Sequence, residues 1–200
     1  DYLPQDENAR RFVIIERAIQ YAARAHKGAV RKGSNVPYIA HPMETMMLVA
    51  SMTDDNEVIA AAALHDVVED TPQIEQEFGA TIATYVAHES ENKCEDRPKS
   101  ETWKIRKQEQ LEKARHASRF VKCIMLADKL SNMRASLRDF QKEGRQIWNK
   151  FNMKDEREQY WYYHEVAEVV KELEDTACYQ EYISILQEVF GALDKEMHRD

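Results

Sequence analysis

The sequence has few residues of the kinds that make turns, cross-links or membrane spans. Only 5 glycines and 5 prolines occur in 200 residues, which favours long helices with short connections. The three cysteines, Cys94, Cys123 and Cys178, form no Cys-x-x-Cys pair, so neither a disulfide framework nor a thiolate zinc site is indicated. No apolar run is long enough to cross a bilayer. The expected fold class is all-α.

Acidic residues outnumber basic ones, with 36 Asp and Glu against 28 Lys and Arg and a net charge of −8. Non-specific binding to nucleic acid needs a clustered basic surface, so we expect no nucleic acid partner. Residues 1–7 lack the basic and apolar stretches of a secretory signal, so we expect a cytoplasmic protein with no membrane partner. The length suggests a single domain over 1–200, with a core at about 10–175 and a C-terminal helix at 178–195.

Apolar residues recur at helical spacing along most of the chain. The pattern predicts a first helix over 12–26, a basic loop over 28–37 and a second helix opening at His41-Pro42. It also predicts a nearly apolar helix over 58–70 that ends at Thr71-Pro72, and helices over about 81–88 and 120–140. The charged stretch 89–115 reads as a solvated loop and an exposed helix, and two amphipathic helices follow near the end.

Four ionisable residues interrupt the apolar helix predicted over 58–70. His65 and Glu69 are four residues apart, as are Asp66 and Asp70, so a continuous helix would place each pair on one face. Carboxylates are rarely buried without a counter-ion or a metal ion. This cluster therefore predicts a site with ligands and acid or base groups together.

Two other helices carry residues that suit the same site. Asp128 and Asn132 share the four-residue spacing in apolar surroundings, and His41 stands at the start of another helix. Imidazole and carboxylate ligands without thiolate favour manganese, iron or zinc, with open positions left for water.

These residues follow the H…HD…D pattern of the HD phosphohydrolase superfamily, and the surrounding strings resemble the hydrolase domain of the RelA/SpoT family. The resemblance spans about residues 10–175, which is nearly the whole chain. In this extent the chain resembles stand-alone small alarmone hydrolases such as the metazoan SpoT homologues. The matching strings are Ala25-His26-Lys27-Gly28, Arg31-Lys32, Pro37-Tyr38-Ile39-Ala40-His41-Pro42, Leu64-His65-Asp66-Val67-Val68-Glu69-Asp70-Thr71 and Leu126-Ala127-Asp128-Lys129-Leu130-Ser131-Asn132-Met133-Arg134.

The resemblance implies a single-domain, Mn²⁺-dependent hydrolase that removes pyrophosphate from the 3′ position of guanosine tetra- or pentaphosphate. It implies one Mn²⁺ ion held by four ligands, and a catalytic acidic pair that orients and deprotonates the attacking water. The implied ligands are His41, His65, Asp66 and Asp128, and the implied catalytic pair is Glu69 and Asp70.

The resemblance also implies how a phosphorylated purine nucleotide is bound. Arg31 and Lys32 match basic residues that meet the nucleotide, His26 matches a histidine before that basic loop, and Asn132 matches an asparagine at the sugar. Tyr162 is our choice from an aromatic cluster in which a tyrosine of the metazoan relatives touches the nucleotide. The sequence does not indicate an oligomeric state.

Other interpretations of the same residues stay open. The chain departs from many family members after residue 86, which leaves the base and sugar specificity undecided. An HD hydrolase of another nucleotide, such as an adenosine alarmone or an NADPH-like dinucleotide, is one alternative. A catalytically silent module that senses nucleotides is another. Singly, His65-Asp66 would equally suit a buried hydrogen-bonded pair, and Arg31 and Lys32 a solvated loop.

Overall fold

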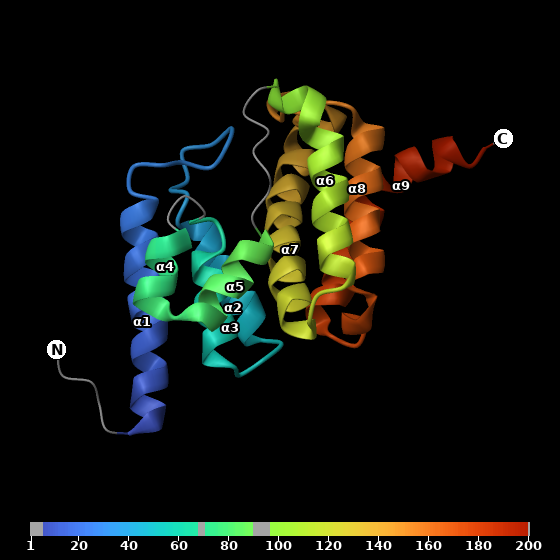
Figure 1. Cartoon of the computed structure of the whole chain (residues 1–200). Helices are drawn as coiled ribbons and strands as arrows, with labels where there is room; N and C mark the ends of the chain where they lie inside the picture. The colour runs from blue at the N-terminus through green and yellow to red at the C-terminus, as the bar shows by residue number, and fades with distance from the viewer. Residues whose placement is uncertain (1–5, 68–70, 90–96, 200) are drawn as a thin grey trace.

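The computed structural model describes residues 6–67, 71–89 and 97–199, and the regular elements in these ranges are helices (Figure 1). The predicted all-α class is confirmed. The helices are α1 (Glu7–Ala25), α2 (Ala40–Ala50), α3 (Asn56–Leu64), α4 (Thr71–Phe78), α5 (Ala80–Glu89), α6 (Lys99–Arg115), α7 (Arg119–Glu143), α8 (Glu156–Val169) and α9 (Ala177–Met197), with short 3-10 helices η2 (Gly144–Lys150) and η3 (Lys171–Leu173). None of them is both long and apolar enough to span a bilayer.

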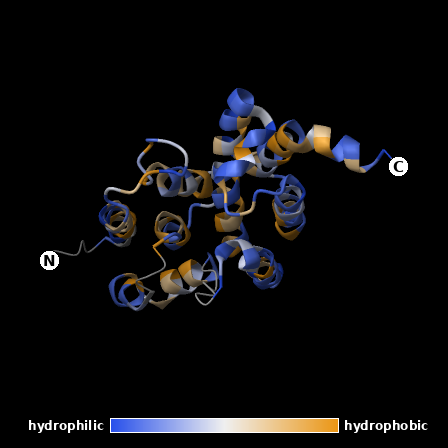
Figure 2. Ribbon diagram, turned by 90° about the horizontal axis from the view of Figure 1, so that it is seen from above, coloured by the Kyte–Doolittle hydropathy of each residue, from blue (hydrophilic) through white to orange (hydrophobic). Residues whose placement is uncertain are grey.

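The helices form two neighbouring groups that meet at α7. In Figure 1, α1 to α5 lie on one side and α6, α8 and α9 on the other. Within the first group α3 packs against α1, α2 and α5, and α2 in turn packs against α7. The view from above in Figure 2 looks along several helices and shows hydrophobic and hydrophilic residues on different sides of each. One continuous hydrophobic core joins the two groups.

Helix α3 is the buried centre of the first group. Every residue from Val58 to Leu64 is buried, and four of these are alanines, which let neighbouring helices approach closely. Its start follows from sequence, because the Asp55 carboxylate accepts hydrogen bonds from the backbone N–H groups of Glu57 and Val58. Asp55 is therefore the N-cap of this helix.

The far end of α3 differs from the prediction. The helix ends at Leu64, so the expectation of one helix over 58–70 is wrong for its described part. The imidazole of His65 explains the end, because its Nδ1 donates to the carbonyl of Ala62 at 2.7 Å. In a continuing helix the N–H of Asp66 would occupy that carbonyl. Asp66 therefore lies in a turn, and the four-residue helical spacing from Asp66 to Asp70 does not apply.

Helix α7 is buried on more than one side, because it packs against both α2 and α9. Its buried residues include the polar side chains of Asp128, Lys129 and Ser131. The Ser118 side chain caps its start, and Gly144 ends it with a φ of +65°, a left-handed conformation that favours glycine. This helix faces α2 on one side and α9 on another, which places its polar residues between the two groups.

Two further expectations need correction. Thr71-Pro72 opens α4 instead of only ending the preceding segment, because proline suits a first helical turn. Helix α6 is not an exposed helix, since Trp103 and Leu111 are buried where α6 packs against α8. Because most residues of α6 are charged or polar, its sequence shows no clear apolar stripe that would predict this buried face.

The basic loop predicted between the first two helices is present. It is held as a narrow loop by an isolated bridge between Val30 and Pro37, and the N–H of Tyr38 donates to the carbonyl of Ala29 at 2.8 Å. Gly28, where α1 has just ended, has a φ of +80°. The loop carries Arg31 toward the N-terminal end of α2 and toward α7.

Candidate metal centre and active site

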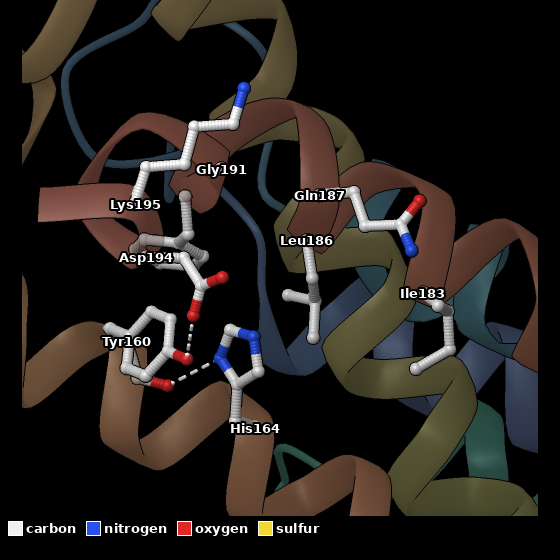
Figure 3. Close-up of a pocket in the computed structure, with 9 residues that line it drawn as sticks. Tyr160, His164, Ile183, Leu186, Gln187, Gly191, Asp194 and Lys195 are labelled. Atoms are coloured by element: carbon white, nitrogen blue, oxygen red, sulfur yellow. Dashed lines mark hydrogen bonds between the residues drawn. The ribbon is translucent and has the colours of Figure 1, made fainter. Parts of the chain in front are cut away.

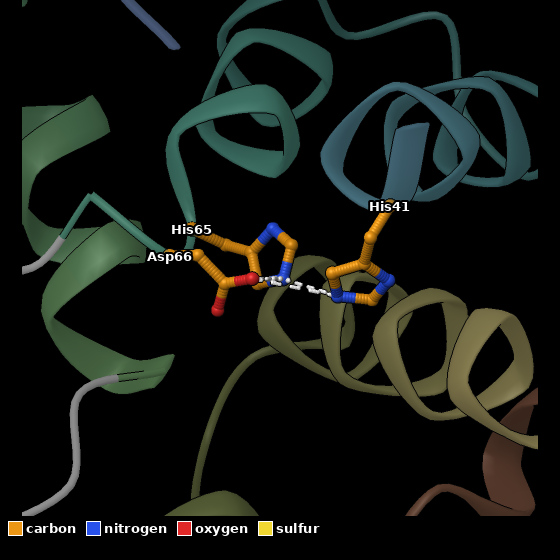
Figure 4. Close-up of side chains that lie close together, drawn as sticks. All are labelled: His41, His65 and Asp66. Carbon is orange, nitrogen blue, oxygen red and sulfur yellow. Dashed lines mark hydrogen bonds and ion pairs between the residues drawn. The ribbon is translucent and has the colours of Figure 1, made fainter. Parts of the chain in front are cut away.

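The four predicted ligands lie close together in the described structure. His41 lies in the first turn of α2, His65 and Asp66 follow α3, and Asp128 lies in the middle of α7. The Nε2 atoms of His41 and His65 are 3.3 Å apart, and Oδ1 of Asp128 lies 3.0 and 3.4 Å from them. Oδ2 of Asp66 lies 3.5 and 3.3 Å from the same two nitrogens. Figure 4 shows His41, His65 and Asp66 directed toward one another.

The hydrogen bonds on the outer sides of the two imidazoles fix their tautomers. Nδ1 of His65 faces a carbonyl oxygen, which only accepts, so this nitrogen carries the proton. Nδ1 of His41 faces Oγ of Ser131 at 2.8 Å, and that hydroxyl donates in turn to Oε2 of Glu44. In the neutral form of each ring the lone pair is then on Nε2, which points into the cluster.

Two nitrogen lone pairs that each lie within about 3.5 Å of both carboxylate oxygens are repelled by them unless a proton or a cation lies between. Ligand atoms bound at about 2.0–2.2 Å to one metal ion lie roughly 3.0–3.5 Å apart, which matches these spacings. His41, His65 and Asp66 form a group that could hold a metal ion, and Asp128 contacts both of its histidines. The donor set of two imidazoles and two carboxylates suits a divalent transition metal.

The charges around the cluster also favour a cation. Burial alone would lower the pKa of His65, but Asp66 and Asp128 raise it to about 10. Burial alone would raise the pKa of Asp128, yet the neighbouring ammonium of Lys129 and the two histidines hold it well below its ordinary value. Lys129 Nζ lies 2.6 Å from Oδ2 of Asp128. Asp66 and Asp128 thus favour a positive charge at His65, which a proton supplies when no metal ion is bound.

Tyr38 and His26 form one wall of the site. The hydroxyl of Tyr38 donates to Oδ2 of Asp66 at 2.5 Å, and its ring lies against the ring of His26 with centroids 4.9 Å apart. Burial lowers the pKa of His26, and no described residue gives its buried Nε2 a hydrogen-bond partner. His26 is thus close to the ligands and keeps one free ring nitrogen.

Arg31 and Asn132 extend the site from the other side. Nη2 of Arg31 donates to Oδ1 of Asn132 at 3.3 Å, and Nδ2 of Asn132 donates to Oδ1 of Asp128 at 3.2 Å. A residue of the basic loop is thereby joined to the metal cluster through α7. The structure brings Arg31, Asn132 and Asp128 together as one hydrogen-bonded chain.

Lys32 and Tyr162 line a cavity of about 170 Å³ that is rich in basic and aromatic side chains. Tyr162 is buried, and its hydroxyl donates to Gln110 at 2.7 Å. Nζ of Lys32 lies 6.0 Å from the ring centroid of Phe151. The cavity is lined by Lys32, Trp103, Arg106, Lys107, Phe151, Asn152, Met153, Gln159, Tyr162 and Tyr163.

The predicted catalytic pair, Glu69 and Asp70, lies outside the described residues. A different acidic residue, Glu89 at the end of α5, lies near the cluster. Burial, followed by the charge of Asp128, raises the pKa of Glu89 to about 7. Its Oε2 is buried, and no described residue donates a hydrogen bond to it.

Sequence reasoning missed four residues around the predicted ligands: Tyr38, Lys129 and Ser131 contact a ligand directly, and Glu44 is joined to His41 through Ser131. Three of the four could have been noticed, because Glu44 and Ser131 lie three residues after His41 and Asp128, and Lys129 is charged within an apolar run. Tyr38 contacts Asp66 through the fold alone, since 28 residues separate them.

A second cavity of about 500 Å³ lies between α8 and α9, away from the metal cluster (Figure 3). The hydroxyl of Tyr160 donates to Asp194 at 2.6 Å there, and the rings of Tyr160 and His164 stack with centroids 3.9 Å apart. None of the predicted site residues lines this cavity.

Comparisons with known proteins agree with the geometry. Residues 18–156 match the model of the HD domain family. The chain is 36% identical over 134 residues to the guanosine-3′,5′-bis(diphosphate) 3′-pyrophosphohydrolase MESH1 of Danio rerio, covering 64% of this chain and 71% of that protein. It is 35% identical over 167 residues to the Homo sapiens MESH1, covering 80% of this chain and 84% of that protein.

A solved structure described as a metazoan orthologue of SpoT that hydrolyses ppGpp and plays a role in starvation responses superimposes with a TM-score of 0.65 at 27% identity. That match covers 90% of this chain and 95% of the other. The resemblance found in the sequence motifs is confirmed. The chain therefore belongs to the HD domain family of hydrolases and, within it, to the family that contains the MESH1 pyrophosphohydrolases.

Proposed function

We propose that this chain hydrolyses guanosine tetra- or pentaphosphate at the 3′ position, releasing pyrophosphate and leaving GDP or GTP, and that its metal ion is Mn²⁺. The observation that carries the proposal is the convergence of His41, His65, Asp66 and Asp128 in a chain whose relatives are named for this reaction. The proposed roles of individual residues rest on their places around this cluster.

The four ligands suit a divalent ion because their donor atoms face one another at the spacing of a coordination shell. Such an ion would supply a water of lowered pKa and a positive charge for a phosphoryl oxygen. The chain itself directs both Nε2 atoms toward the ion by giving both Nδ1 hydrogens an acceptor. Lys129 holds Asp128 in its charged form.

We propose that Glu69 and Asp70 orient and deprotonate the attacking water, on the strength of the motif that they share with the RelA/SpoT hydrolases. They follow the ligand Asp66 by three and four residues, so the chain can carry them no further than about 15 Å from it. A carboxylate beside the ligands can accept a proton without itself binding the ion.

Arg31, Lys32 and the basic-aromatic cavity account for an anionic substrate in a chain of net charge −8. Guanidinium and ammonium groups match phosphate oxygens, and aromatic faces suit a purine. We propose that the phosphates meet Arg31 and Lys32, that Asn132 meets the sugar, and that Tyr162 borders the nucleotide. His26, beside Tyr38, would donate to a phosphate oxygen.

We also propose that residues 1–200 form a single domain that acts in the cytoplasm. Helices α2 and α7 pack against each other and each carries a proposed metal ligand, which supports a single domain. A division between the two helix groups would split the ligand set.

The test is a direct assay of product formation. Protein freed of metal with a chelator and reloaded with Mn²⁺ is incubated with guanosine tetraphosphate, and ³¹P NMR follows the products. We expect equal amounts of GDP and pyrophosphate, and no turnover before reloading. Intact guanosine tetraphosphate would refute the substrate, and parallel reactions with 3′-phosphorylated adenosine nucleotides and NADPH would reveal the alternative hydrolases. Binding of nucleotide without any turnover would identify a sensing module.

Variants test the site itself. Asp66→Asn should lower kcat by more than the roughly 10–100-fold that loss of an outer hydrogen-bond partner of a metal ligand costs. Asp54→Asn is the matched control, because Asp54 is exposed and lies between α2 and α3 away from the cluster. Equal rates for the two variants would contradict the proposed ligand set.

A further inference from the structure

The ring of His41 is held from behind by a chain of hydrogen bonds that reaches the C-terminal helix. Nδ1 of His41 lies 2.8 Å from Oγ of Ser131, and this hydroxyl lies 2.6 Å from Oε2 of Glu44. Nη1 of Arg134 donates to Oε1 of Glu44 at 3.0 Å. Arg134 also forms a two-point contact with Glu181 of α9, through Nε at 2.6 Å and Nη2 at 2.7 Å.

The direction of these hydrogen bonds follows from the chemistry of the partners. Burial alone would raise the pKa of Glu44, but Ser131 and Arg134 lower it, so Glu44 is a carboxylate and only accepts. The Ser131 hydroxyl has one hydrogen and gives it to Glu44. Its oxygen then accepts the hydrogen on Nδ1 of His41, which leaves the lone pair of this ring on Nε2.

Each member has a second partner that restricts its orientation. Ser131 is fully buried within α7, so its side chain has little freedom apart from these contacts. The planar guanidinium of Arg134 is held on two edges, by Glu44 from α2 and by Glu181 from α9. The carboxylate of Glu44 is therefore fixed from both sides, by Ser131 and by Arg134.

We propose that Ser131, Glu44, Arg134 and Glu181 form a positioning chain that selects the metal-binding tautomer of His41 and sets the affinity of the site for its ion. This inference deepens the proposed function, because it rests on the cluster being a metal site. It assigns α9 a part in metal binding, although α9 contributes none of the four proposed ligands. None of the four positioning residues contacts the proposed nucleotide cavity.

If the positioning chain acts on His41, variants should lose less affinity for Mn²⁺ the further they lie from His41. Ser131→Ala removes the acceptor of the Nδ1 hydrogen and should weaken Mn²⁺ binding about 10–100-fold. Glu44→Gln, which leaves the Ser131 hydroxyl without a charged acceptor, should weaken it about tenfold. Glu181→Gln acts two bonds further away and should have the smallest effect. Ser131→Thr keeps the hydroxyl and should restore most of the affinity lost in Ser131→Ala.

The experiment measures Mn²⁺ binding alone, by isothermal titration calorimetry on the full chain after chelation. Ser136→Ala is the control for Ser131→Ala, since Ser136 is also buried in α7 and lies five residues further along. Glu188→Gln is the control for Glu181→Gln, because Glu188 likewise joins α9 to α7, through Gln141 at 3.2 Å, without touching this chain. Thermal melts check that each variant is folded.

A second measurement reads the tautomer directly. Selective ¹⁵N labelling of histidine in the metal-free wild type should show the hydrogen of His41 on Nδ1, and Ser131→Ala should lose that preference. The proposal is overturned if folded Ser131→Ala and Glu44→Gln bind Mn²⁺ as tightly as the controls, or if His41 carries its hydrogen on Nε2. If Ser131→Ala does not fold, Glu44→Gln decides alone.

These readouts separate this inference from the proposed function. If the wild type binds Mn²⁺ tightly and the Ser131→Ala variant binds it weakly, the proposed positioning chain is supported even if guanosine tetraphosphate is not cleaved. If the Ser131→Ala variant instead cleaves guanosine tetraphosphate and has an unchanged affinity for Mn²⁺, the proposed positioning chain is refuted and the proposed function stands.

Discussion

Replacing Asp128 with asparagine should destabilise the fold even when no metal is present. The carboxylate is buried and accepts contacts on both oxygens: His41, His65 and Asn132 face Oδ1, and Lys129 faces Oδ2 at 2.6 Å. The Lys129 side chain is only 8% exposed, so bulk water can do little to replace this partner of its ammonium. Asp128→Asn keeps the shape and removes only the charge.

The size of the effect follows from the charge that is left behind. Removing one partner of a buried ion pair costs about 3–5 kcal/mol because the other charge stays buried. The asparagine carbonyl can still accept from Lys129, so we expect the lower end, about 3 kcal/mol. At roughly 2–4 °C per kcal/mol for a chain of this size, the midpoint of thermal unfolding should fall by about 6–12 °C.

Urea denaturation of chelated protein measures this cost. Asp128→Asn/Lys129→Met should recover much of it, because no buried charge is left unpaired at this position. Glu172→Gln provides the control, because its partner Lys122 lies on α7 like Asp128. Lys122 is 2.6 Å from a Glu172 side chain that is 41% exposed, so loss of this pair should cost under about 1 kcal/mol. The reasoning fails if Asp128→Asn costs no more than Glu172→Gln, or if adding Lys129→Met recovers nothing.

Three further predictions concern the ion, the substrate and pH. Mn²⁺ at 100 times its Kd should stabilise the wild type by about 2.7 kcal/mol, and differential scanning calorimetry should show a much smaller shift for Asp66→Asn. Lys32→Met should raise KM about tenfold while calorimetry shows unchanged Mn²⁺ binding, and an unchanged KM would remove Lys32 from substrate binding. Because the folded pKa of Glu89, about 7, exceeds its ordinary 4.5, metal-free protein should lose stability as pH rises from about 4.5 to 7. Glu89→Gln should remove about 1–3 kcal/mol of that loss, and identical urea midpoints of variant and wild type at pH 5 and pH 8 would contradict this.

The helices that line the core could be predicted because their apolar residues repeat at helical spacing. The stripes of α7, the Asp55 cap of α3 and the glycine after α1 each act within a few residues, so the local sequence is enough to predict them. The burial of one face of α6 could not be predicted in this way. Its buried Trp103 pairs with Trp161 and Tyr162 of α8, and these partners are far away in sequence.

In the candidate site, too, some features could be predicted from the local sequence and others depend on residues far away in sequence. The motif identified His41, His65, Asp66 and Asp128, and the fold brings each carboxylate within about 3.5 Å of both histidines. The partners that orient them come from other helices. Tyr38 meets Asp66 across 28 residues, and Ser131 meets His41 across 90. Contacts of this kind depend on tertiary packing, which helical periodicity alone does not determine.

The end of α3 shows how closely the fold and the site depend on each other. A helix that continued through Asp66 would use the carbonyl of Ala62 for a backbone hydrogen bond, and Nδ1 of His65 would have no partner there. In the structure that carbonyl accepts Nδ1 of His65 at 2.7 Å, and Asp66 turns back so that its Oδ2 lies 3.3 Å from Nε2 of the same ring. One hydrogen bond therefore stops the helix, selects the tautomer and places two neighbouring residues on the same side of the cluster. Two adjacent residues of an intact helix point about 100° apart, whereas here the ligand atoms of His65 and Asp66 lie 3.3 Å from each other.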